Sequence, residues 1–362
     1  MVLEPFKIIP KRFLGIDIGT SSIKLIELSR WGERKKLENY GEIKASALYK
    51  EPFRTFEKST LSLSNQNISR AIKAILEEAK IKTRQVIFSI PDFSSFFTNF
   101  ELPPMSQEEL SQAVLYEAKR HVPVPFGEVA LDWQVIEGPT NQKQKKSKIL
   151  LVAVPNEVIH QYQTIAEISN LELRALEAEA FGLLRSLVGE EITQPLALVD
   201  IGAQTTTCSI VEKKILKTSH SFDLSGNELT EVVSKGLGID YEEAGVLKKE
   251  YGLLREQRGE NGKGKEIREI LTPLIDVILR EIERVCQSFS QIEGKEVEKI
   301  ILAGGTALLP GLKEHFQDFF KKEIQIADPF SSMFYPPILE NTLKQMGPSF
   351  AIAVGMALRG LE

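Results

Sequence analysis

The feature that most constrains this 362-residue chain is a motif that occurs twice. An apolar segment ends in Asp17-Ile18-Gly19, then come hydroxyl residues and a second apolar segment, and the pattern recurs at Asp200-Ile201-Gly202. Each copy is typical of two antiparallel strands joined by a tight turn. Glycine lets backbone N–H groups approach an anion, and Ser or Thr hydroxyls can donate to phosphate oxygens. Each copy therefore predicts a phosphate-binding hairpin.

The acidic residue of each copy suggests a metal ion. We expect Asp17 and Asp200 to face a Mg²⁺ ion that bridges the phosphates, with water between the ion and the carboxylates. Mg²⁺ keeps several waters and is usually bound by one or two carboxylates together with substrate phosphates. The alternative is two unrelated β-turns whose Asp side chains cap their own backbones. Two copies at corresponding places favour the metal site.

The repeat also predicts the domain organisation. Because each copy opens a segment of similar length, we expect a first domain over residues 1–193 and a second over 194–362, facing each other across a cleft. Strand and helix patterns between residues 86 and 155 predict a small α+β insert in the first domain. Within it, Ser106 to Glu109 forms a capping-box pattern at a helix start.

Four further segments carry specific expectations. Helical periodicity covers Leu61 to Ala79 and Glu177 to Leu187. The charged segment from Arg255 to Lys265 is expected to be disordered, and the lysine-rich segment from Asn141 to Lys148 to be a mobile hairpin loop.

Composition excludes several classes of function. The net charge is −5, which argues against a surface that neutralises nucleic-acid phosphates. No apolar run approaches the roughly 18 residues of a membrane-spanning helix. The first twelve residues lack the apolar core of a signal peptide. We therefore expect a cytoplasmic protein with no nucleic-acid partner and no direct membrane insertion.

A third glycine motif follows an apolar segment near the C-terminus. Lys299 to Ala303 is expected to be a buried strand that runs directly into Gly304-Gly305-Thr306. Adjacent glycines are explained by a turn with positive φ, or by a nucleoside that lies against the backbone. Downstream of two phosphate hairpins, the second explanation is favoured.

This ordered set of motifs resembles the actin-like ATPase superfamily over nearly the whole chain. The resemblance implies an α/β fold in which two ribonuclease-H-like domains enclose a nucleotide cleft that holds ATP and Mg²⁺. Two longer stretches, from Leu102 to Leu110 and from Glu117 to Val135, resemble the PilM family of type IV pilus assembly proteins.

The resemblance also implies the nucleotide-binding residues. They fall into two phosphate motifs, a glycine turn, one lysine and the adenosine motif: Asp17, Gly19, Thr20, Ser21, Ser22, Lys24; Asp200, Gly202, Ala203, Gln204, Thr205, Thr206; Gly226, Asn227; Lys248; Gly304, Gly305, Thr306. One departure lies beside the lysine, where Gly245 replaces a glutamate common in relatives. Glu177 resembles the water-positioning acid of the first connecting helix, although Glu177 and Glu179 are equally explained as solvated helix carboxylates.

The resemblance implies a cytoplasmic, ATP-binding component of an inner-membrane assembly platform. It would dock the N-terminal cytoplasmic peptide of a PilN-like membrane protein, and self-association is compatible with it. One alternative is an FtsA-like membrane-associated filament protein, but we expect no amphipathic tail because the sequence ends at Glu362 directly after an apolar helix. The other is a sugar-type kinase, for which no motif supplies a base.

Overall fold

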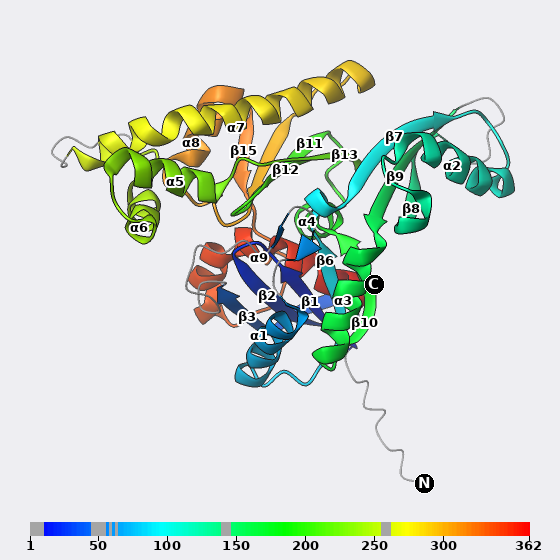
Figure 1. The fold of residues 1–362 in the computed structure, drawn as a ribbon, viewed down its shortest axis with the longest axis horizontal. Helices are drawn as coiled ribbons and strands as arrows, with labels where there is room; N and C mark the ends of the chain where they lie inside the picture. Colours follow the sequence, from blue (N-terminus) through cyan, green and yellow to red (C-terminus); the bar gives the residue numbers. More distant parts are fainter. Residues whose placement is uncertain (1–10, 45–55, 58–59, 62–63, 139–145, 255–261) are drawn as a thin grey trace, which may run out of the picture.

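The computed structural model describes residues 11–44, 56–57, 60–61, 64–138, 146–254 and 262–362. The two halves of the described chain each contain a five-stranded mixed sheet, and a separate three-stranded sheet lies beside the second half (Figure 1). The segment expected to be a mobile loop falls largely outside these residues, although Ser147 and Lys148 are part of a strand.

The sheet of the first half has the order β10-β6-β1-β2-β3. Its first two strands form the antiparallel hairpin that the motif predicts, and in it Asp17 lies opposite Lys24. β3 continues the hairpin antiparallel to β2, whereas β6 pairs in parallel with β1, and β10 in parallel with β6. The strands are β1 (Lys11–Ile18), β2 (Ser22–Trp31), β3 (Arg34–Lys44), β6 (Gln85–Ile90) and β10 (Glu172–Ala178), with the short pair β4 (Phe56–Glu57) and β5 (Thr60–Leu61) nearby.

Helices cover both faces of this sheet. On one face, α1 (Asn65–Glu78) and α3 (Asn156–Ile168) contribute to a buried apolar cluster with β1 and β6. On the other face lie α4 (Glu179–Leu187) and α9 (Glu340–Leu361), the C-terminal helix. The expected helix from Leu61 starts later, because Leu61 belongs to β5 and Ser64 caps α1.

The second half repeats this arrangement with the order β13-β12-β11-β14-β15. Its hairpin again starts the unit, with β13 antiparallel to β12 on one side and β14 parallel to β11 on the other. The elements are β11 (Leu196–Ile201), β12 (Thr206–Glu212), β13 (Ile215–Phe222), α5 (Gly226–Leu237), α6 (Tyr241–Tyr251), α7 (Lys263–Glu293), β14 (Lys299–Ala303), α8 (Leu312–Phe320) and β15 (Glu323–Ile326). The segment expected to be disordered falls partly outside the described residues, and its last three residues are helical in α7 rather than disordered.

The insert is a three-stranded sheet in the order β7-β9-β8 with one helix. Its elements are η2 (Asp92–Ser94), β7 (Phe96–Leu102), α2 (Gln107–His121), η3 (Phe126–Glu128), β8 (Val129–Glu137) and β9 (Ser147–Pro155). The predicted capping box is present, since Ser106 Oγ accepts from Glu109 N and Glu109 Oε2 accepts from Ser106 N. The expected insert started at residue 86, but β6 belongs to the first sheet, so the separate sheet starts at Phe96.

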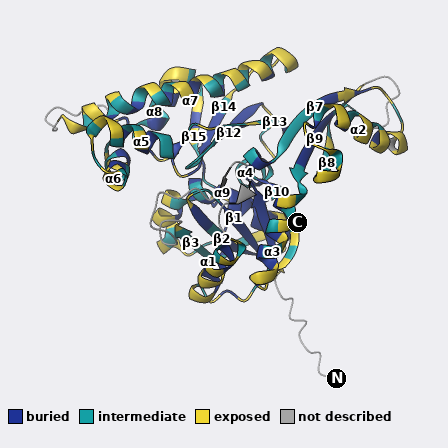
Figure 2. Cartoon of the chain, in the orientation of Figure 1, coloured by how far each residue is buried: buried dark blue, intermediate teal, exposed yellow. Residues whose placement is uncertain are grey.

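The buried residues lie mainly in the central strands and on the inner helix faces (Figure 2). α9 is the clearest case, because most of its second half is buried against β1, β2 and α4. η4 (Pro337–Leu339) precedes this helix. Although α9 follows the second hairpin in sequence, it packs against the sheet of the first half. Among the described residues, no helix is both long and apolar enough to cross a membrane.

Candidate functional site between the two hairpins

The first hairpin places Asp17 at the end of β1 in a polar environment. Ser89 Oγ, from the end of β6, donates to Asp17 Oδ1 at 2.8 Å, and Lys24 Nζ lies 3.7 Å from Oδ2. The turn is closed by Gly19 N donating to Ser22 O at 3.0 Å. Asp17 is 3 % exposed, so its carboxylate is held by these groups and largely screened from water.

The second hairpin repeats the same turn. Gly202 N donates to Thr205 O at 3.0 Å, and Asp200 lies opposite Thr207. Burial and, to a smaller extent, the negative charge of Asp17 raise the pKa of Asp200 to about 7, while Lys24 opposes the shift. The two hairpins therefore bring their carboxylates close enough to repel each other.

The glycine turn and the adenosine motif lie against this second hairpin. Gly226 N donates to Gly202 O at 3.0 Å and Asn227 N to Ala203 O at 2.8 Å. A Cβ on Gly226 would lie 2.7 Å from Thr306 Oγ1. Thr306 N donates in turn to Ile201 O at 3.2 Å. The structure thus brings three predicted motifs together around one backbone turn.

Two features of the structure require glycine at position 304, namely its backbone conformation and the proximity of Asp200. Its φ is +87°, and a Cβ there would lie 2.4 Å from Asp200 Oδ1. Gly305 differs, because a Cβ at that position would meet nothing within 4 Å. The first glycine therefore shapes the site around Asp200, and the second leaves open space.

Several of the remaining predicted residues already form hydrogen bonds with other groups of the chain. Thr206 Oγ1 donates to Leu224 O at 2.5 Å, and Lys248 Nζ donates to Gly226 O at 2.6 Å and Thr230 Oγ1 at 2.7 Å. Burial lowers the pKa of Lys248 to about 8. In contrast, Gln204 Oε1 in the second turn is buried and has no hydrogen-bond partner among the described residues. The hairpin residues Thr20 and Thr205 are half-buried and Ser21 is exposed, while Ser22 is buried.

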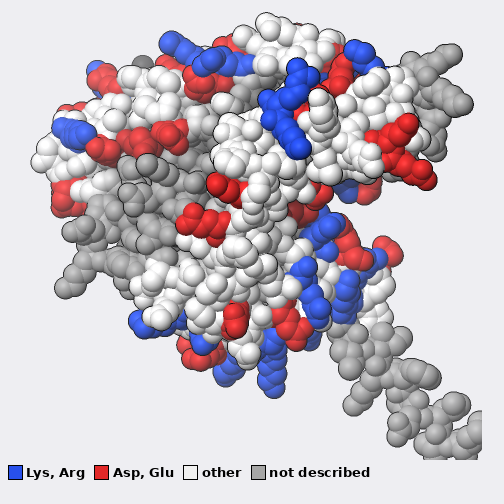
Figure 3. Space-filling view, turned by 45° about the vertical axis from the view of Figure 1, so that its right-hand side comes forward, with Lys and Arg blue, Asp and Glu red and all other residues white. Residues whose placement is uncertain are grey.

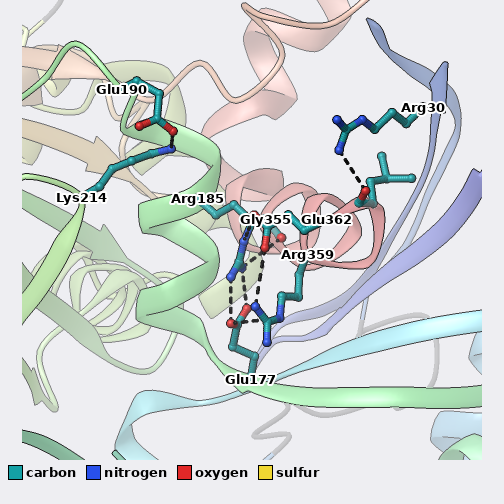
Figure 4. A network of polar contacts seen from close by, with 9 residues as sticks. Arg30, Glu177, Arg185, Glu190, Lys214, Gly355, Arg359 and Glu362 are labelled. Carbon is teal, nitrogen blue, oxygen red and sulfur yellow. Dashed lines mark hydrogen bonds and ion pairs between the residues drawn. The ribbon is translucent and has the colours of Figure 1, made fainter. Parts of the chain in front are cut away.

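The sequence predicts Glu177 in a connecting helix, and this prediction is wrong. Glu177 lies in β10 rather than in the connecting helix, and its carboxylate binds the Arg185 guanidinium through two contacts of 2.5 and 2.9 Å (Figure 4). Arg359 Nε of α9 lies 3.8 Å away, and Arg185 also binds Glu362. Glu177 is therefore part of an ion-pair network that ties β10 and α4 to α9.

Glu179, the first residue of α4, is the acid whose carboxyl interacts electrostatically with those of both hairpins. Its pKa is raised well above the ordinary value by burial, then by the charges of Asp17, Asp92 and Asp200. Asp92 N donates to Glu179 Oε2 at 3.3 Å. Asp92 itself has a pKa raised to about 6 by burial. Neither Glu177 nor Glu179 is a solvated helix carboxylate.

Sequence reasoning missed Ser89 and Asp92. Both follow or end a buried strand, β6, but the segment has no glycine turn or repeated motif. The parallel pairing of β1 with β6 could have found Ser89, because the ends of parallel strands lie at one sheet edge. The spacing of residues in the sequence gave no indication that Asp92 would contact the start of α4.

The carboxyl groups of this site suit a bound cation that itself carries an anionic ligand. Four carboxyl groups influence one another, namely those of Asp17, Asp92, Glu179 and Asp200. No group of three or more His, Cys, Asp or Glu within the described residues is arranged to hold a metal by itself. A metal that also carries ligand oxygens and water is compatible with both facts. Two cavities of about 510 and 950 Å³ lie elsewhere, along α7 and α8, and no predicted site residue lines them.

Comparisons with known proteins identify the family of this chain. The family model described as type IV pilus assembly protein PilM matches residues 15–361. The cell division protein FtsA of Enterococcus faecalis is 22 % identical over 367 residues, covering 91 % of this chain and 82 % of that protein.

Solved structures share the fold. A chain of a PilM–PilN type IV pilus biogenesis complex superposes with a TM-score of 0.82 at 24 % identity, covering 96 % of this chain and 98 % of the other. MreB5 of Spiroplasma citri bound to ADP gives a TM-score of 0.56 at 13 % identity, covering 96 % and 95 %. The fold is the actin-like ATPase fold, whose relatives include nucleotide-bound proteins. The chain belongs to the PilM family of type IV pilus assembly proteins.

Proposed function

We propose that this chain is the ATP-binding, cytoplasmic component of a type IV pilus inner-membrane platform. In this role it docks the cytoplasmic tail of a PilN-like membrane protein and is held at the membrane through that partner. The observation that carries the proposal is the convergence of Asp17, Asp200 and the backbone turns of two equivalent hairpins, inside a chain of the PilM family.

Nucleotide binding is supported by the donors and the open space at the hairpins. Both turns carry backbone N–H groups and hydroxyls, which can donate to phosphate. The second also carries Gln204, whose amide oxygen is an acceptor that is buried without a partner among described groups. Gly304 leaves the side of Asp200 free of a Cβ. Buried polar atoms are usually hydrogen-bonded, so an unpaired one indicates a missing ligand or water.

Mg²⁺ fits between the carboxylates. Asp17 and Asp200 would hold it through water, because their mutual repulsion is relieved by a divalent cation and a closed metal cage is not needed. When bound, the ion supplies charge neutralisation for the phosphate oxygens. Lys24, 3.7 Å from Asp17 Oδ2, is placed to contribute a second positive charge.

Glu179 is the residue that we propose to orient water if the nucleotide is hydrolysed. It faces the hairpins, whereas Glu177 is occupied by Arg185. The hydrogen bond from Asp92 N to Glu179 Oε2 helps to fix this carboxyl at the start of α4.

The insert is the proposed docking element. In the described part of the chain, β7 and β8 are the two edges of its sheet, with β9 between them. An extended peptide that adds a strand to an exposed edge gains backbone hydrogen bonds, and alternate side chains enter pockets. Of the two edge strands, β8 has an alternating pattern of exposed and half-buried residues, which suits such an addition.

The binding proposal is tested by isothermal titration of Mg²⁺–ATP into wild type and the Asp200→Ala variant. We expect the variant to lose at least about tenfold in affinity, since it removes one of two carboxylates around the metal. Asp223→Ala, at an exposed position after β13, is the matched control and should bind as wild type does. Equal affinity in Asp200→Ala would refute the assigned role.

Turnover is tested separately with Glu179→Gln and Glu177→Gln. Loss of ATP hydrolysis in Glu179→Gln, with Mg²⁺–ATP affinity retained, is the expected result. If only Glu177→Gln lost activity, the assignment of Glu179 would be wrong.

A further inference from the structure

Asp92 lies where the insert leaves the first half. β6 ends at Ile90 and β7 begins at Phe96, so Asp92 is at the root of the insert, and it is 3 % exposed. Its backbone N–H donates to Glu179 Oε2 at 3.3 Å, and its Oδ1 accepts from Ala180 N at 3.2 Å. This reciprocal pair fixes the root of the insert to the start of α4.

The other oxygen of Asp92 reaches the second half of the chain. Ser219 Oγ, on β13, donates to Asp92 Oδ2 at 3.0 Å. Ser219 Oγ also lies 2.9 Å from Ser209 Oγ of β12, the strand that leaves the second hairpin. Asp92 therefore contacts Glu179 on one side and, through Ser219, the strand pair that carries the second hairpin.

The insert sheet is attached to the same strand, β13, at further points. Asn99 Nδ2 of β7 donates to Lys217 O at 2.6 Å, and Lys217 Nζ donates to Ile136 O of β8 at 3.2 Å. Lys217 is buried and lies 3.6 Å from Glu212 Oε2. Lys148 of β9 forms an ion pair with Glu293 at the end of α7. The insert is thus covalently part of the first half but is held by the second, and Figure 1 shows it beside β13.

We propose that Asp92 is a positioning residue that couples the nucleotide site to the insert, through Ser219 and β13. This inference rests on the proposed nucleotide binding. A ligand between the two hairpins changes the separation of the halves that carry them, because the facing carboxylates repel each other without it. Since β13 moves with the second hairpin, its contacts to Asn99 and Ile136 move the insert relative to α4. The insert therefore adopts a nucleotide-dependent orientation.

The test is hydrogen–deuterium exchange of backbone amides in β7 and β8, without nucleotide and with Mg²⁺ and the non-hydrolysable analogue AMPPNP. In wild type we expect the analogue to change exchange in these strands by about threefold or more. Ser219→Ala should lose most of this difference, and Ser219→Thr, which keeps the hydroxyl, should retain it. Ser331→Ala removes an exposed hydroxyl that bonds only locally, to Asp328 O, and is the matched control.

Asn99→Leu provides a second disruption, at a different contact with β13, in case Ser219→Ala does not fold. Analogue affinity is measured on the same samples. Normal affinity with no change in β7 and β8 of wild type would overturn the coupling and leave the proposed nucleotide binding intact. The same holds if Ser219→Ala and Asn99→Leu keep the full response. Absence of analogue binding in wild type would overturn both proposals.

Discussion

At the scale of single residues, Asp200 destabilises the nucleotide-free protein when it is ionised. Its pKa is about 7, against 3.8 for an ordinary Asp, so between these values the folded state binds more protons than the unfolded state. Stability contributed by this group therefore falls as pH rises from about 4 to 7.

We expect Asp200→Asn to stabilise the nucleotide-free protein at pH 8, because it removes this buried charge. The gain is at most about 4 kcal/mol, and less where water reaches the half-buried carboxylate. Urea unfolding of wild type, Asp200→Asn and the exposed control Asp223→Asn measures it. If the variant were less stable than wild type at pH 8, the ionised Asp200 carboxylate would not be destabilising the folded protein.

Lys248 is a second residue whose charged form lowers the stability of the folded protein. Its pKa is about 8 in the folded state against 10.5 ordinarily, since burial disfavours the ammonium form. Between these values the unfolded state binds more protons, so the contribution of Lys248 to stability rises with pH.

We expect the unfolding free energy of wild type, minus that of Lys248→Met, to rise by up to about 3 kcal/mol between pH 8 and 10.5. Subtracting the variant removes the titration of other groups. Lys249→Met, at an exposed position, should give no such rise. A difference that does not change with pH would mean that burial does not perturb the pKa of Lys248.

At the scale of elements, the turn after β14 sets the wall of the site beside Asp200. Gly304 and Gly305 are adjacent but differ, since only Gly304 has a positive φ and a near contact with the Asp200 carboxylate. A side chain at Gly304 must displace this carboxylate, whereas one at Gly305 enters open space.

We expect Gly304→Ala to weaken Mg²⁺–ATP binding by at least about tenfold and to cost about 1–3 kcal/mol of stability, because of the strained φ and the displaced Asp200. Gly305→Ala is the matched control and should remain within about 0.5 kcal/mol of wild type. Titration calorimetry and urea unfolding measure the two quantities. Equal effects of both substitutions would contradict the assignment of Gly304 to the site.

At the scale of the whole molecule, the repeat predicted the duplicated unit but not how the two units are tied together. Local patterns identified both hairpins and the capping box, since strand periodicity and turn residues are encoded within short segments. The return of α9 to the first sheet depends on close backbone packing instead. A Cβ on Gly15 would lie 2.0 Å from Ala353 O, and one on Gly355 would lie 2.0 Å from Gly182 O.

The candidate site could be predicted only in part, for the same reason. Residues in repeated glycine turns were recognisable, whereas Glu179 and Asp92 act through contacts between segments that are distant in sequence. The different surroundings of Glu177 and Glu179 follow from where β10 ends and α4 begins. Charges of both signs are interspersed on the face shown in Figure 3, so that face offers no single electrostatic marker of function.

The central claim is that one molecule of nucleotide binds between the two hairpins with Mg²⁺. The most direct measurement is chromatographic analysis of nucleotide released from the freshly purified protein, repeated after incubation with Mg²⁺ and ATP and removal of unbound ligand. We expect close to one nucleotide per chain in wild type and little in Asp200→Ala. Retained intact ATP would identify a nucleotide-stabilised docking platform, and accumulating ADP a cycling ATPase. A wild-type chain that retains no nucleotide under either condition would contradict the claim.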